Sequence, residues 1–279
     1  MKITATIQAR TGSSRLPGKV LLPIVGKPML ELQVERVRQS RLIDEIVIAT
    51  SSNPQDDAIE QLADRCRVGC FRGSEQDVLG RIVAALQSVQ AELHVELMGD
   101  SPLADPLLID ACIGYYLKHA DRYDYVTNGL TTTFPPGMEV TIYPARILVD
   151  AERLSTDASL REHVSCHITQ RPERYRLCNL EAPRWFRCPD YYLEVDAPED
   201  FEVISSIFEH FYPAHPGFGL AQIIDFLNAH PSLAAKNRFV DRRWRAFRQD
   251  PPHADASHQR KGPEAQAREG DSLIRSGRA

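Results

Sequence analysis

Strand-like and helix-like segments alternate through the first 128 residues, and this alternation limits the possible folds more than any other feature. Four short apolar or alternating segments have the pattern of β-strands: residues 3–9, 45–51, 93–99 and 123–128. Four segments between them carry apolar residues at helical spacing: residues 29–39, 56–66, 77–89 and 106–119. Repeats of this kind form mostly parallel sheets that helices cover on both faces. We therefore predict a three-layer α/β sandwich.

The regular alternation ends after residue 128. Further strands are expected at residues 138–143, 175–181 and 191–196, with helices at 145–154 and 159–170. We interpret residues 129–189 as a small α+β insertion that projects from the sheet, because ordinary connections have only about 2–6 residues. Two more helical segments close the domain, at residues 198–211 and 220–228.

The C-terminal region is basic first and then polar. Residues 236–248 contain six Lys or Arg residues and one acid, with Trp244 and Phe247 among them. Such a stretch could bind nucleic acid, but we favour a helix that docks its aromatic residues and exposes its arginines. Residues 250–279 contain almost no large apolar residues, which predicts a disordered tail after a domain of residues 1–249.

Composition excludes several classes of protein. The hydrophobic content of 43% is typical of globular proteins, and no apolar run is long enough to span a membrane. The net charge of −5 argues against a nucleic-acid partner. Six cysteines without a C-x-x-C pair, and no signal peptide, predict free thiols and a cytoplasmic location without membrane insertion.

Residues 9–19 join the first strand to the next helix and carry three cations, Arg10, Arg15 and Lys19. Backbone N–H groups and fixed positive charge in such a loop favour an anion, and phosphate is the obvious candidate. The spacing is neither that of a Walker A loop nor that of G-x-G-x-x-G. A basic surface loop without a ligand is less favoured, because three cations within eleven residues repel one another. We expect Lys19 to be a point charge on the solvent side.

Two carboxylates follow predicted strands. Asp100 comes after the segment 93–99, and Asp196 ends the segment 191–196. Ligands of open α/β sheets bind beyond the carboxyl ends of the strands, and carboxylate oxygens suit Mg²⁺. Either residue alone would be read as a turn or N-cap aspartate. Together with the basic loop, they predict a magnesium site.

The first 30 residues also resemble a known family. The matching residues are 7–10, Ser13, 15–19 and 26–29, and further islands extend to Asp200. They are similar to the opening of the cytidylyltransferases, which activate sugar acids such as 3-deoxy-manno-octulosonate and acylneuraminates as CMP-sugars. The spore-coat polysaccharide biosynthesis branch is the most similar. The resemblance implies a Rossmann-like, GT-A-like nucleotidyltransferase sheet and a homodimer, with residues 129–189 helping to form the acceptor site and the dimer contact.

The implied reaction is attack of an acceptor hydroxyl on the α-phosphate of CTP, which yields a CMP-sugar for surface polysaccharide and releases pyrophosphate. The resemblance implies these nucleotide-binding residues: Gln8, Ala9, Arg10, Ser13, Arg15, Lys19, Arg72, Ser74 and Asp100. Arg10, Arg15, Lys19 and Asp100 are the expected catalytic residues. Arg72 is expected to read cytosine. Asp100 and Asp196 lie on the family's two metal-binding motifs, Gly-Asp-x-Pro and Val-Asp-x-Pro-Glu-Asp.

The acceptor site is expected to include Asn128, Glu139, Arg161 and His163. Residues 161–163 match an Arg-Glu-His motif of the branch, and an arginine there would bind a carboxylate through two hydrogen bonds. Glu139 stands where the branch has aspartate, and Thr141 stands where it has glutamate. These differences leave open a sugar phosphate or a phosphonate as acceptor.

Other functions remain as alternatives at this point. A glycosyltransferase of similar sheet architecture usually has Asp-x-Asp, which Asp100 lacks. A non-catalytic scaffold is disfavoured because Lys19, Asp100 and Asp196 are all present. Asp77 and Arg81 lie one helical turn apart, and we expect them either to pair with each other or to contact a ligand.

Overall fold

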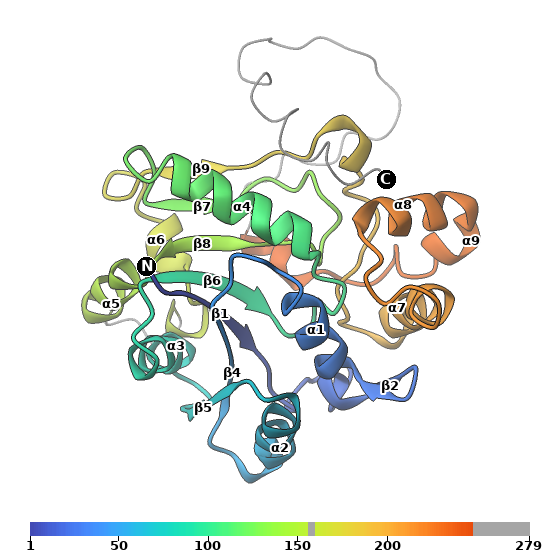
Figure 1. The fold of residues 1–279 in the computed structure, drawn as a ribbon, viewed down its shortest axis with the longest axis horizontal. Helices are drawn as coiled ribbons and strands as arrows, with labels where there is room; N and C mark the ends of the chain where they lie inside the picture. Colours follow the sequence, from blue (N-terminus) through green and yellow to red (C-terminus); the bar gives the residue numbers. More distant parts are fainter. Residues whose placement is uncertain (156–159, 248–279) are drawn as a thin grey trace.

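A central sheet, covered by helices on both faces, runs through the protein in the computed structural model, which describes residues 1–155 and 160–247 (Figure 1). Within these residues the sheet has seven strands in the order β5-β4-β1-β6-β8-β7-β9. Their bounds are Ile3–Gln8 (β1), Glu45–Ser51 (β4), Gly69–Gly73 (β5), Leu93–Met98 (β6), Tyr125–Thr127 (β7), Thr141–Pro144 (β8) and Leu177–Asn179 (β9). A separate short hairpin pairs Pro23–Ile24 (β2) with Lys27–Pro28 (β3). The predicted tail, residues 250–279, lies outside the described residues.

Most neighbouring strands are parallel, as predicted. β1 pairs in parallel with both β4 and β6, and β4 pairs in parallel with β5. β8 is antiparallel to its neighbours β6 and β7. The carboxyl ends of β1, β4 and β6 therefore lie at one edge of the sheet, where ligands of α/β proteins bind.

The helices form the two outer layers. One face is covered by α1 (Met29–Val37), α2 (Asp57–Cys66) and α4 (Pro106–Lys118). The other face is covered by α3 (Val78–Ser88), α5 (Ala145–Leu154) and α6 (Cys166–Thr169). The helices α7 (Pro198–Phe211), α8 (Leu220–Ala229) and α9 (Pro231–Ala234) extend the core beside α1 (Figure 1). The three-layer α/β prediction is confirmed. Among the described residues, no helix has both the length and the apolar character that crossing a membrane requires.

Residues 129–189 do not simply project from the sheet, contrary to our expectation. β8 lies between β6 and β7, and β9 extends the same sheet beyond β7 (Figure 1). Ile142 and Tyr143 in β8 are fully buried, and pairing on both sides satisfies the backbone groups of this short strand. The segment is therefore part of the sheet.

Three other expectations were wrong in detail. The segment 191–196 is not a strand, because its N–H groups donate to two different segments: Leu193 to Pro136 and Val195 to Asp100. Within 159–170 the described part contains a 3₁₀ turn, Leu160–Glu162, and then α6. The basic stretch contains only the 3₁₀ turn Arg243–Phe247 in its described part. The edge strand β5 was not predicted.

Candidate active site

The loop after β1 is fixed to the 3₁₀ turn Pro54–Asp56, which follows β4. The N–H and the hydroxyl of Thr11 both donate to Asp56 Oδ1, at 2.8 and 2.7 Å. Burial alone would raise the pKa of Asp56, but hydrogen bonds from Ser51 and Thr11 outweigh it and lower that pKa. The loop ends at Gly18, whose φ of 67° suits glycine and starts the 3₁₀ turn Lys19–Leu21. Lys19 is thereby turned back toward the sheet.

Lys19 lies between the two predicted metal ligands. Its Nζ is 3.2 Å from Asp100 Oδ2 and 3.0 Å from Asp196 Oδ1, and it donates to the Val195 carbonyl at 2.6 Å. Burial alone would lower the pKa of Lys19, but the two carboxylates outweigh it and raise that pKa. The ammonium is therefore charged and buried, so the expectation of a solvent-side lysine was wrong.

Asp196 has a second cation. Arg15 Nη2 is 2.6 Å from Asp196 Oδ2, and Arg15 Nη1 donates to the Asp241 carbonyl. Burial would raise the pKa of Asp196, but Lys19 and Arg15 outweigh it and hold that pKa below its ordinary value. The Asp196 carboxylate is therefore ionised and positioned by two cations of the first loop.

The turn after β6 brings Asp100 to the same point. Gly99 donates its N–H to the Gln8 carbonyl at 2.8 Å, and a Cβ at Gly99 would lie only 2.5 Å from that oxygen. Only glycine permits this approach. The Asp100 carbonyl accepts from the N–H of Val195 at 2.8 Å, which joins the turn to the segment that carries Asp196.

Arg10 is the most accessible cation of the loop. Its side chain is 40% exposed, against 25% for Arg15 and 11% for Lys19. Its guanidinium lies 3.9 Å from Glu75 and 3.8 Å from Glu162, which brings it close to the expected acceptor motif. Arg10 therefore faces solvent at the rim of the site.

Three other predicted nucleotide residues lie in or beside this loop. Ala9 is buried in the core. The Gln8 amide donates to Glu96 at 3.3 Å. The Ser13 hydroxyl accepts the N–H of Leu16 at 3.4 Å. Their contacts support the loop, and their contact with a nucleotide stays a prediction.

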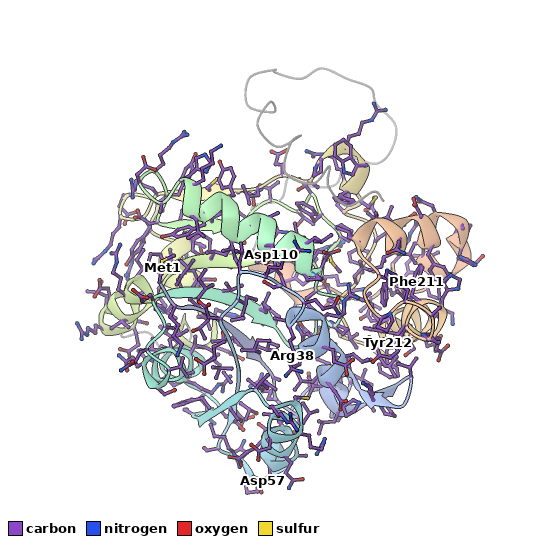
Figure 2. The ribbon with its side chains drawn as sticks, viewed as in Figure 1. Met1, Arg38, Asp57, Asp110, Phe211 and Tyr212 are labelled. Atoms are coloured by element: carbon purple, nitrogen blue, oxygen red, sulfur yellow. The ribbon has the colours of Figure 1, made fainter. Side chains whose placement is uncertain are left out.

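Arg72 and Ser74 lie farther along the edge of the sheet. Arg72 pairs with Asp57 at 2.6 Å and with Glu60 at 2.8 Å, and it also donates to the carbonyls of Ser51 and Asn53. Asp57, labelled in Figure 2, marks the start of α2 against which this guanidinium lies. The role of Arg72 in reading cytosine stays a prediction.

Ser74 lies before α3 and contacts its first turn, including Arg81. The Ser74 hydroxyl accepts the N–H of Asp77 at 3.0 Å, and the Ser74 carbonyl accepts from Arg81 at 2.6 Å. The Asp77 carboxylate caps α3 through the N–H of Gly80. It forms its close ion pair with Arg161, through bonds of 2.9 and 2.7 Å, rather than with Arg81.

Arg161 joins three elements. Besides Asp77, it pairs with Glu152 of α5 at 2.6 Å and donates to the Ser155 carbonyl. The hydrogen bonds that Arg161 donates to the Asp77 and Glu152 carboxylates raise its pKa. Its guanidinium is engaged within the protein, so an acceptor carboxylate would have to exchange with these partners. Its role at the acceptor stays a prediction.

The remaining expected acceptor residues lie on two segments. Asn128 is buried and spans its loop, donating to the Met138 carbonyl at 2.9 Å and accepting from Val140 at 2.7 Å. Glu139 accepts the N–H of Gly137 at 2.7 Å. His163 follows Glu162, the residue near Arg10. The contacts of these three residues do not test whether they bind an acceptor, so that role stays a prediction.

Sequence reasoning missed a group of buried charges beside Asp196. Glu194 accepts from Trp244 Nε1 at 2.6 Å and lies 3.4 Å from Arg242. Burial and the nearby charge of Glu139 raise the pKa of Glu194 to about 8, although Trp244 and Arg242 oppose the shift. The basic stretch was expected to expose its arginines, and Arg238, Arg243 and Arg245 are exposed, but Arg242 is buried. It lies there because its guanidinium pairs with the Asp200 carboxylate at 2.6 Å.

The two carboxylates around Lys19, those of Asp100 and Asp196, fit a bound Mg²⁺. Asp100 and Asp196 already converge on one cation, the Lys19 ammonium, and both offer hard oxygen ligands. Within residues 1–155 and 160–247 no group of three or more His, Cys, Asp or Glu side chains is arranged to hold a metal. Two carboxylates suit Mg²⁺, which takes its other ligands from phosphate and water.

Comparison with known proteins identifies the family. Residues 4–229 match the sequence model described as Cytidylyltransferase. The chain belongs to the cytidylyltransferase family. The spore coat polysaccharide biosynthesis protein SpsF of Bacillus subtilis is 36% identical over 235 residues, which cover 82% of this chain and 95% of that protein. The 8-amino-3,8-dideoxy-manno-octulosonate cytidylyltransferase of Shewanella frigidimarina is 35% identical over 130 residues, 46% of this chain and 53% of that protein.

Solved structures have the same fold. A cytidylyltransferase from Leptospira borgpetersenii superposes with a TM-score of 0.81 at 28% identity, covering 87% of this chain and all of that one. The CMP:2-keto-3-deoxy-manno-octonic acid synthetase in complex with CTP gives a TM-score of 0.57 at 20% identity, covering 75% and 99%. At that identity the likeness concerns the fold alone. The family and fold expected from the first 30 residues are thus confirmed.

Proposed function

We propose that this protein transfers CMP from CTP to a hydroxyl group of a sugar-acid-like acceptor and releases pyrophosphate. One observation carries the proposal: Lys19, Asp100 and Asp196 meet at the carboxyl ends of β1 and β6, beside the basic loop. Charge of both signs at this edge suits a triphosphate with its counterion. The names of the relatives, a spore coat polysaccharide protein and an amino-sugar-acid cytidylyltransferase, support the acceptor class.

The chain's own residues act by position and charge. Arg10, Arg15 and Lys19 would hold the β- and γ-phosphates of CTP and neutralise the negative charge that grows on the leaving pyrophosphate. Lys19 and Arg15 already contact Asp196, so the same cations position that carboxylate. This arrangement orients the α-phosphate toward the acceptor and requires no covalent intermediate.

Asp100 and Asp196 would hold Mg²⁺. When bound, Mg²⁺ supplies Lewis-acid stabilisation of the phosphate charge and lowers the pKa of the attacking hydroxyl. The acceptor would lie near Glu162 and His163, since Arg10 links the phosphate loop to that motif. The homodimer and the cytoplasmic location belong to the same proposal.

Nucleotide selectivity tests the proposal. Pyrophosphate release is measured with CTP, UTP, ATP and GTP, each with Mg²⁺ and either 3-deoxy-manno-octulosonate, its 8-amino derivative or an acylneuraminate. We expect release from CTP with at least one of these acceptors. Isothermal titration of the four nucleotides should rank CTP first. Tighter binding of ATP or GTP by a factor of ten, about 1.4 kcal/mol, would contradict the proposal.

A further inference from the structure

The segment 236–245, which we call the C-terminal strap, packs behind the turn that carries Asp196. The match to the cytidylyltransferase model ends at residue 229, so the strap lies outside it. Two of its side chains, Asn237 and Arg242, are buried, although the strap has little regular structure. Buried polar residues in such a segment must have specific partners, because unpaired ones would be costly.

The main partner of the strap is Asp200, whose side chain is fully buried. Asp200 Oδ2 accepts the backbone N–H groups of Asp196 and Ala197, both at 2.9 Å. Asp200 thereby sets the backbone turn from which the Asp196 carboxylate reaches Lys19. The orientation of Asp196 depends on where the Asp200 carboxylate lies.

Arg242 fixes that carboxylate. Its guanidinium donates two bonds to Asp200, Nη2 to Oδ1 at 2.6 Å and Nη1 to Oδ2 at 3.0 Å. Its side chain is fully buried, lies over the Tyr192 ring at 4.5 Å and comes within 3.4 Å of Glu194. Arg242 therefore contacts residues on both sides of Asp196 in the sequence. Asn237 adds a bond of 2.8 Å to Asp200 Oδ1.

The strap also contacts the front of the site. The carbonyl of Asp241 accepts from Arg15 Nη1, while Arg15 Nη2 pairs with the Asp196 carboxylate. Adjacent strap residues thus contact both the backbone behind Asp196 and the cation in front of it. A strap that only stabilised the fold would not need the hydrogen bond between Arg15 and the Asp241 carbonyl.

We propose that Arg242 is a positioning residue that holds Asp196 in place through Asp200. The inference rests on the proposed cytidylyl transfer, since it assigns Arg242 a role in that reaction. Arg242→Lys is the sharpest substitution, because lysine keeps the charge but lacks the planar fork that donates two parallel bonds. Arg243→Gln is the matched control, since Arg243 is the exposed neighbour in the strap.

Hydrogen exchange of the full chain tests the positioning without any substrate. In Arg242→Lys, the amides of Asp196 and Ala197 should exchange about tenfold faster, while those of β1 and β6 exchange as in the wild type. Arg243→Gln should change neither. Unchanged exchange at Asp196 and Ala197 would overturn the inference. If Arg242→Lys does not fold, Asn237→Ala should show the same local effect with a smaller amplitude, since it removes one bond to Asp200.

Kinetics tests the link to the reaction. For Arg242→Lys we expect kcat for pyrophosphate release to fall about tenfold, with KM for CTP changed less than twofold, because Asp196 would be misplaced while the phosphate loop remains. An unchanged kcat, or a loss that only follows the folded fraction, would overturn the role. If the wild type does not turn over CTP, the proposed function fails, and the exchange result alone decides whether Arg242 fixes Asp196.

Discussion

Several charged side chains around the carboxyl ends of β1 and β6 are paired with opposite charges and largely withdrawn from water. Lys19, Asp196 and the Arg242–Asp200 pair all follow this rule. The motifs predicted that Lys19, Asp100 and Asp196 would meet, since they lie at the carboxyl ends of neighbouring segments. They could not predict that Arg242 reaches Asp200. These two residues are 42 positions apart and meet only through the path of the strap.

Replacing Lys19 by alanine should impair both activity and stability. Turnover should fall at least 100-fold, about 2.7 kcal/mol of barrier, because a phosphate ligand is lost. The free energy of unfolding should fall by about 2 kcal/mol, because Asp100 and Asp196 would face each other without the cation between them. Pyrophosphate release and urea unfolding measure the two effects.

Lys27→Ala provides the control for Lys19→Ala, since Lys27 is a more exposed lysine that pairs with Glu31 and Glu35. It should leave turnover unchanged. A Lys19→Ala protein with wild-type turnover at saturating CTP would show that Lys19 has no part in the reaction.

At the scale of elements, the sequence predicted helices well where the apolar periodicity and the residues typical of helix ends agreed. The helix expected at 106–119 is Pro106–Lys118, and the helix expected at 145–154 is Ala145–Leu154. The segment 191–196 misled because its pattern reports burial, which residues 192–195 have, whereas a strand also requires a continuous neighbour. The basic stretch misled only at Arg242, whose charge pairs with Asp200 inside the protein, whereas Arg238, Arg243 and Arg245 are exposed as expected.

The Asp105 carboxylate joins the starts of two helices, α4 and α8. Asp105 Oδ1 accepts the N–H groups of Leu107 and Leu108 at the start of α4, and Oδ2 accepts that of Leu220 at the start of α8. Asp105→Ala should lower the free energy of unfolding by about 2 kcal/mol, about 1 kcal/mol for each helix start. Asp105→Asn retains acceptor capacity for α4 and should cost less. Equal unfolding midpoints in urea for wild type and Asp105→Ala would contradict this account.

At the scale of the whole molecule, the two faces of the sheet are buried in different ways. The α1 face of β1 presents Ile3, Ala5 and Ile7 to an apolar core. On the α3 face, Thr6 bonds with His94 at 2.7 Å. Between the neighbouring strands β8 and β6, the Tyr143 hydroxyl donates to the Glu96 carboxyl group at 2.7 Å. The alternation of β1 predicted a strand, but it could not predict that Thr4 and Thr6 are buried as well, nor which polar groups pair across strands.

This polar layer predicts a pH-dependent stability. Burial raises the pKa of Glu96 to about 7, although hydrogen bonds from Tyr143 and Gln8 oppose the shift. The folded state therefore retains a proton that the unfolded state releases from its ordinary value of 4.5 upward. The contribution of Glu96 to stability is full below that value and is lost as pH rises to about 7.

The contribution of His94 to stability depends on pH in the opposite direction. Burial lowers its pKa to about 3, so its contribution is present above its ordinary value of 6.5 and is lost as pH falls toward 3. Glu96→Gln removes only the Glu96 contribution. Relative to the wild type, its free energy of unfolding should increase by roughly 2–3 kcal/mol between about pH 5 and pH 7. Urea unfolding across this range measures the difference, and parallel curves for the two proteins would contradict it.

The most direct test of the account is a double-mutant cycle on Asp100 and Asp196, read by pyrophosphate release from CTP. Asp100→Asn and Asp196→Asn should each reduce turnover at least 100-fold, about 2.7 kcal/mol of barrier, because each removes a hard anionic ligand. The double variant should be no slower than the slower single variant, since both carboxylates serve one ion. Independent multiplicative effects, or full activity in excess EDTA, would contradict a shared cation site at the ends of β1 and β6.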